Sequence, residues 1–153
     1  MCKAKYHLLL LISAILVPIS WFLNMGWFRF LLTFLTLPYI HFIVFIIINN
    51  ISISKLFKSE KLKKYILLSC VTYISAYLLF PDVADIGEAY VFFGLIENDT
   101  ISYESGVFSI LFCIWNIAIL IMEIIEIIKL KSCTGSNKLF KIENKNNDSK
   151  DEF

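Results

Sequence analysis

Charged residues are scarce in this chain of 153 residues: lysine, arginine, aspartate and glutamate together make up 18% of it. Soluble domains carry about 25% charged residues, so the shortage argues against a soluble domain. Glycine, with 5 residues, and proline, with 3, are also rare. The net charge of +1 offers no basic surface to a phosphate backbone, and we expect no nucleic-acid partner.

The sequence also lacks the motifs of enzymes, metal sites and cofactor sites. It has no glycine-rich phosphate loop, no HExxH zinc motif and no GxSxG motif. Its four cysteines form no CxxC pair, which excludes the usual spacing of zinc sites and of thiol–disulfide exchange. Carboxylates at positions 82, 85 and 88 favour a solvated face over a tight cation site. We therefore expect no catalytic residue, no metal site and no cofactor.

Long apolar runs are what the chain has in abundance, and 58% of its residues are hydrophobic. Four runs stand out, at 7–23, 30–48, 65–80 and 107–128. A helix rises ~1.5 Å per residue, so ~20 residues cross a hydrocarbon layer of ~30 Å. The third run is short, but lysines at its start can reach the headgroups. We predict an all-α membrane protein in which residues 1–131 form four transmembrane helices, arranged as two helical hairpins.

The basic residues indicate how these helices cross the bilayer. Two lysines precede the first run, five lie between the second and third runs, and six follow the fourth; Arg29 is the remaining basic residue. Segments rich in lysine stay in the cytoplasm. We therefore predict cytoplasmic termini for a multi-pass protein of the plasma membrane, or of the inner membrane in a bacterium. The five lysines expected to fix this topology are Lys55, Lys58, Lys61, Lys63 and Lys64.

The segment between the third and fourth runs, residues 81–106, has six carboxylates and no lysine or arginine. Its middle, 89–96, is apolar but too short to cross a bilayer, which leaves a re-entrant turn, an interfacial helix or a strand packed on the bundle. We favour the interfacial helix, because Pro81 followed by Asp82 is a plausible helix start. The tail, 132–153, is polar and is predicted to be disordered.

Polar side chains within the runs are the candidate functional residues, because ionisable groups in a bilayer are costly. His41 lies near the middle of the second run. It is either a titrating or ligand-binding group or, as we favour, a neutral imidazole that shares a hydrogen bond with a neighbouring helix. Ser109, Asn116 and Glu123 are spaced by seven and therefore share one face of the fourth helix. That face is either a polar packing seam, which we favour, or the wall of a cavity.

Small side chains recur at intervals of three and four in the third run, where they let helices approach closely. Matching depths across antiparallel helices places Ser69 near Glu123, and Thr72 or Tyr73 near Asn116 and His41. The second, third and fourth helices are therefore predicted to meet at these positions. The predicted packing residues are Ser69, Thr72, Ala76 and Ser109, and the candidate functional residues are His41, Asn116 and Glu123.

Three classes of function remain. We favour a small non-enzymatic protein that sits in the lipid bilayer and binds or modulates another integral membrane protein or a second copy of itself. In size, in its several spans and in its composition, which is typical of AT-rich coding DNA, the chain resembles immunity proteins against pore-forming bacteriocins. That likeness of architecture implies an immunity or exclusion protein of a mobile element as the alternative. A small oligomeric transporter or ion pathway that uses His41 and Glu123 comes last, because four short spans leave little room for a pathway in a monomer.

Overall fold

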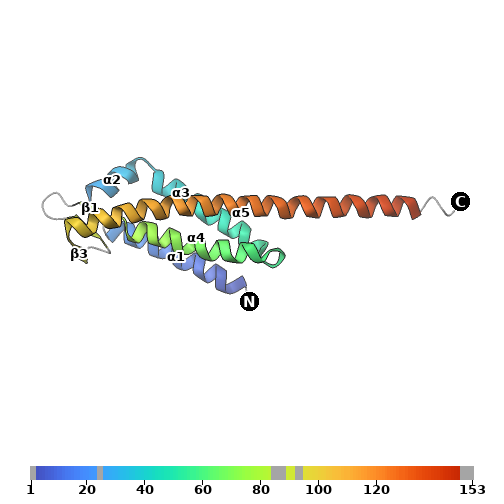
Figure 1. Ribbon diagram of the computed structural model, residues 1–153, viewed down its shortest axis with the longest axis horizontal. Coiled ribbons are helices and arrows are strands. Elements are labelled where there is room, and N and C mark those ends of the chain that lie inside the picture. The colour runs from blue at the N-terminus through green and yellow to red at the C-terminus, as the bar shows by residue number, and fades with distance from the viewer. Residues whose placement is uncertain (1–2, 24–25, 84–88, 92–94, 149–153) are drawn as a thin grey trace.

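The computed structural model describes residues 3–23, 26–83, 89–91 and 95–148, and it is built mainly from helices (Figure 1). Within these residues, three helices are long and apolar enough to cross a membrane: α1, α3 and the part of α5 up to Ser132. The chain is therefore a predominantly helical, membrane-associated protein. The helices are α1 (Lys3–Leu23), α2 (Trp27–Phe34), α3 (Leu37–Ser54), the 3-10 helix η1 (Leu56–Lys58), α4 (Glu60–Leu78) and α5 (Asp99–Asp148).

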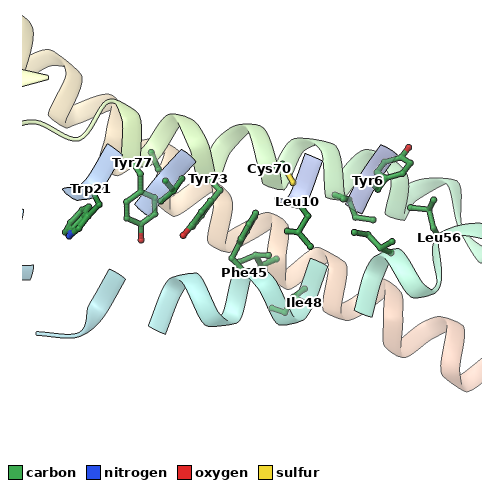
Figure 2. Packing of buried hydrophobic residues seen from close by; sticks show 14 residues of the cluster. Tyr6, Leu10, Trp21, Phe45, Ile48, Leu56, Cys70, Tyr73 and Tyr77 are labelled. Atoms are coloured by element: carbon green, nitrogen blue, oxygen red, sulfur yellow. The ribbon is translucent and has the colours of Figure 1, made fainter. Parts of the chain in front are cut away.

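Helix α4 packs chiefly against α5 and α1, with α3 completing the bundle. Figure 1 shows the N-terminus and the connection between α3 and α4 at one end, and the short strands at the other. Helix α5 extends beyond the end that holds the N-terminus. The buried cluster draws chiefly on α1, α3 and α4, with Leu56 from η1 and Leu120 from α5, and its aromatic side chains gather where α1, α3 and α4 meet (Figure 2). The rings of Phe45 and Tyr73 stack there, with their centroids 3.9 Å apart.

The second predicted span, 30–48, is interrupted rather than continuous. Helix α2 ends at Phe34 and α3 begins at Leu37, with Thr36 between them at a φ of 60°. Proline explains the break, because Pro38 has no N–H to bond the carbonyl of Phe34 and its ring would crowd that carbonyl. The predicted end at Ile48 is also too early, since α3 continues to Ser54.

Helices also form at the other three predicted runs, with bounds that differ from the predicted ones. Helix α4 begins five residues before position 65 and ends two residues before position 80. Helix α5 contains the whole predicted span 107–128. The tail predicted to be disordered differs most, because α5 continues through it to Asp148; the remaining residues of the tail, 149–153, lie outside the described chain. No proline stops the helix after Ile128, and extending an existing helix requires no new nucleation.

The segment 81–106 forms strands where we favoured an interfacial helix. Strands β1 (Asp82–Val83), β2 (Ala89–Val91) and β3 (Ile96–Glu97) form one antiparallel sheet in that order. β-Branched and aromatic residues favour strands, and Val91 is fully buried in β2. The strand alternative therefore holds for these residues, while positions 84–88 and 92–94 lie outside the described chain.

The five lysines expected to fix the topology gather at one end of the bundle. One precedes η1, one ends it, and three lie in the first turns of α4. All five side chains are exposed or half-buried. They can therefore stay hydrated while the apolar parts of α3 and α4 lie away from water.

Candidate functional site

A layer of polar side chains joins α3, α4 and α5 halfway along the bundle, and His41 lies at its centre. Its Nδ1 atom lies 3.0 Å from the hydroxyl oxygen of Tyr77, and its Nε2 atom lies 3.0 Å from Oδ1 of Asn116. The amide nitrogen of Asn116 donates to the carbonyl of Ser69 at 2.7 Å and to Oγ1 of Thr72 at 2.9 Å. The structure thus brings His41 and Asn116 together between helices, with Thr72 in the same network.

These contacts assign the direction of every hydrogen bond in the layer. A backbone carbonyl only accepts, so the group of Asn116 that faces Ser69 must be its NH2. Its oxygen then faces His41, whose Nε2 must carry the proton. Nδ1 is left to accept from the hydroxyl of Tyr77. A neutral imidazole satisfies this network with both ring nitrogens in use. The network continues through Thr72, whose hydroxyl donates to the carbonyl of Leu68 at 2.9 Å.

Aromatic rings enclose this layer. The ring of Tyr73 meets His41 edge-on at 5.2 Å between centroids, and Tyr77 meets Trp21 edge-on at 5.6 Å. Figure 2 shows Trp21, Tyr77, Tyr73 and Phe45 in sequence along the interior of the bundle. Edge-to-face and offset pairs add about 0.5–1.5 kcal/mol each beyond their burial. The rings therefore hold the imidazole in place.

The predicted packing residues lie at the contact between α4 and α5. The hydroxyl of Ser109 donates to the carbonyl of Ala76 at 2.6 Å, and the small side chain of Ala76 favours such a close approach of the helices. Asn116 makes the next contact along the seam. The four packing residues are nearly or fully buried: Ser69, Thr72, Ala76 and Ser109.

Glu123 is fully buried one heptad after Asn116, but its partner is not the one that depth matching indicated. The hydroxyl of Ser52 donates to its Oε2 at 2.6 Å, whereas Oγ of Ser69 accepts from Asn49 at 3.1 Å. Asn49 and Ser52 were not among the predicted functional residues, because the pair Asn49–Asn50 resembles the start of a loop. Their helical spacing from His41 was the available signal.

A buried ion pair at the opposite end was also missed. Arg29 and Asp82 are both 0% exposed, with Nε of the arginine 3.6 Å from Oδ2 of the aspartate. The same oxygen accepts from the backbone N–H of Gly26 at 2.7 Å and of Arg29 at 3.3 Å, so it caps the start of α2. The guanidinium also donates to the carbonyls of Ser20, at 2.8 Å, and Phe80. Asp82 is therefore not part of a solvated acidic face.

A partly open groove of about 580 Å³ lies between α3 and α5. Its walls are almost wholly apolar; Trp21, Tyr77 and Phe80 contribute aromatic rings, and His41 and Ser109 contribute polar groups. Five isoleucines line it from α5: Ile110, Ile114, Ile117, Ile121 and Ile124. Leu37, Val44 and Ile48 face them from α3.

Comparisons with models of known protein families, with curated proteins and with solved structures found no match to this chain.

Proposed function

We propose that the chain is a four-span integral membrane protein that binds a second integral membrane protein through the groove between α3 and α5. The observation that carries this proposal is the shape of the groove: two apolar stripes face one another across an unfilled hollow. Exposed apolar side chains alone fit lipid equally well. An unfilled hollow between helices is different, because helices in membranes associate by close packing.

The proposal of a fourth span depends on α4. Helix α3 ends at the end of the bundle where the N-terminus lies, and α5 begins at the other (Figure 1). A chain in which both α3 and α5 cross must therefore return through α4. Helix α4 is less apolar than its neighbours, but eight of its residues are buried, so its polar groups Ser69 and Thr72 contact helices rather than lipid. With 19 residues it reaches ~28 Å at ~1.5 Å per residue.

A topology reporter tests the four spans and the cytoplasmic placement of both termini. We expect an enzyme that is active only outside the cytoplasm to be inactive when fused after residue 58 and active when fused after residue 86. The reason is that the lysines around η1 resist translocation. Activity at residue 58 would show that the threading is inverted or that the number of spans is wrong.

The spacing of the groove residues favours a helix as the occupant. The five isoleucines of α5 follow one another at intervals of four and three, as the core positions of a coiled coil do. From Ile110 to Ile124 they extend ~21 Å at ~1.5 Å per residue, which is most of a membrane span. A transmembrane helix of the partner would fill this length with side chains at the same spacing.

Partner binding is better supported than transport. Both ring nitrogens of His41 are engaged by Tyr77 and Asn116. The imidazole therefore has no lone pair to offer to a moving proton or ion in this arrangement. A partly open groove with almost wholly apolar walls also suits a neighbouring helix better than a polar pathway between the two faces of the membrane.

Photo-crosslinking in native membranes tests the groove. A photoreactive residue at Ile117, which is 47% exposed in the groove, should give one dominant adduct with an integral membrane protein. The same residue at Ile15 is the matched control, because Ile15 is 52% exposed on α1, away from the groove. A photoreactive residue at Val44 should capture the same partner from the α3 side. An adduct of twice the mass of the chain would identify the partner as a second copy.

A variant that fills the hollow completes the experiment. Ile121→Trp should abolish the adduct at Val44, because the indole would occupy the space of the partner helix. Equal adducts at Ile117 and Ile15, or an adduct at Val44 that survives Ile121→Trp, would contradict binding in the groove.

A further inference from the structure

Glu123 is a carboxyl group in the interior of the bundle with a single hydrogen-bonded oxygen. It is 0% exposed, and Ser52 of α3 donates to its Oε2 at 2.6 Å. Its other oxygen, Oε1, has no hydrogen-bond partner within the described residues. Because the protein encloses it completely, bulk water does not solvate Glu123, which also lies in the part of α5 that is apolar enough to cross a membrane.

An ionised carboxylate in this place would need a compensating charge. Burying an unpaired ion costs several kcal/mol, and one hydroxyl donor does not offset that cost. The salt bridges among the described residues are Arg29–Asp82 and Lys63–Glu60, and neither includes Glu123. The compensating charge must therefore be a bound proton or a mobile cation.

Asn49 supplies the group that a bound proton requires. Its side chain is also 0% exposed, and its NH2 donates to the carbonyl of Phe45 at 3.0 Å and to Oγ of Ser69 at 3.1 Å. Its Oδ1 is an acceptor with no partner within the described residues. Asn49 lies one turn before Ser52 on α3, and residues three apart lie on the same face of a helix. A protonated carboxyl has one O–H to donate, and the amide oxygen of Asn49 can accept it.

We propose that Glu123 holds a proton inside the bundle and donates it to the amide oxygen of Asn49, so that this pair is a proton-binding site between α3 and α5. The site is independent of the groove and of any partner. When the helices separate, Glu123 is ionised, so the folded bundle holds one proton more than the separated helices. The packing of α3 on α5 is therefore linked to pH. By linkage, the folding equilibrium weakens as pH rises, by at most about tenfold per pH unit.

The other titratable groups at this end of the bundle do not supply Glu123 with a positive charge in place of the proton. Helix α4 contributes the thiol of Cys70, and α1 contributes Tyr6 and Lys3. The ammonium of Lys3 donates to the carbonyl of Ser54 at 3.2 Å at the exposed surface. Glu126, one turn later on α5, accepts from Ser59 at 2.7 Å. Within the described residues, the contacts of Glu123 therefore include no cation.

Infrared difference spectroscopy of the purified full chain in lipid bilayers tests the proposal. At neutral pH the spectrum of the wild type should contain the carbonyl stretch of a protonated carboxylic acid, and Glu123→Gln should remove it. Glu126→Gln is the matched control and should leave the band in place. Asn49→Val should shift the band, because the acid loses its acceptor. A wild type without this band, or a band that survives Glu123→Gln, would overturn the proposal.

Stability gives a second, independent readout. Gln reproduces the neutral acid, with an NH2 to donate to Asn49 and an oxygen to accept from Ser52. Glu123→Gln should therefore keep the thermal unfolding midpoint of the wild type and lose its decline above neutral pH, whereas Glu123→Ala should lower the midpoint. A Gln variant that fails to fold would overturn the proposal. Stability of the wild type that depends on Na⁺ or K⁺ would also overturn it and assign a metal cation to the site.

Discussion

Replacing Asp82 by asparagine should destabilise the folded chain by about 3–5 kcal/mol, the usual cost of breaking a buried ion pair by removing one partner. The variant leaves the guanidinium of Arg29 without its carboxylate at a fully buried site. It also takes the negative charge away from the first turn of α2, where Oδ2 accepts two backbone N–H groups. Unfolding of the purified protein in detergent micelles or bicelles measures the change in free energy.

Arg29 contacts several of the four elements that meet at this site. Its guanidinium donates to carbonyls at the end of α1 and just after α4, which no helical N–H can satisfy. It also lies over the ring of Trp21, 5.2 Å from the centroid, which adds a cation–π contact. The pair therefore joins the ends of α1 and α4 to the starts of α2 and β1.

Two controls distinguish the effect of breaking the ion pair from the effect of removing any carboxylate in this region. Asp99→Asn should cost less than ~1 kcal/mol, because Asp99 is exposed and accepts a hydrogen bond only from the N–H of Ala89 among the contacts of the described chain. In a double-mutant cycle, Arg29→Met combined with Asp82→Asn should cost less than the sum of the two single changes. Additive effects, or equal losses for Asp82→Asn and Asp99→Asn, would show that the pair does not act as a unit.

The helices could be predicted from the sequence, because an apolar segment in a bilayer must satisfy its backbone hydrogen bonds within itself. This requirement applies to each segment separately and does not depend on distant residues. The interruption at Thr36 could also have been predicted, since Pro38 stands inside the second run. The Arg29–Asp82 pair could not, because the two residues are 53 positions apart and each looks like an ordinary solvated loop residue. Their pairing depends on how the ends of four elements meet in space.

The interior polar residues were predictable in part, for a related reason. The heptad spacing of Ser109, Asn116 and Glu123 is a property of one helix and indicates a shared face. Which residue of α3 meets Glu123 depends on the length of α3 and on its position along α5. Because α3 runs six residues past its predicted end, Ser52 rather than Ser69 reaches the carboxyl group.

Replacing Asn116 by leucine should weaken the bundle by about 2 kcal/mol, because three interhelical hydrogen bonds are lost and such bonds average ~0.6 kcal/mol each in membranes. The variant removes the acceptor of His41 Nε2 and the donor to the carbonyl of Ser69 and to Thr72. The loss is larger than for a single contact, because the side chain of Asn116 takes part in all three of these hydrogen bonds. Unfolding in bicelles measures it, and the orientation of the imidazole can be followed by nitrogen NMR.

Ser109→Ala is the control for this prediction, because it removes one bond from the same seam, the donation to the carbonyl of Ala76. It should cost ~0.6 kcal/mol, about a third of the loss for Asn116→Leu. In wild-type protein the proton of the imidazole should reside on Nε2, and Tyr77→Phe should leave it there, since only the acceptor Nδ1 loses its partner. An Asn116→Leu variant as stable as the wild type would mean that aromatic and apolar packing hold the three helices without the polar layer.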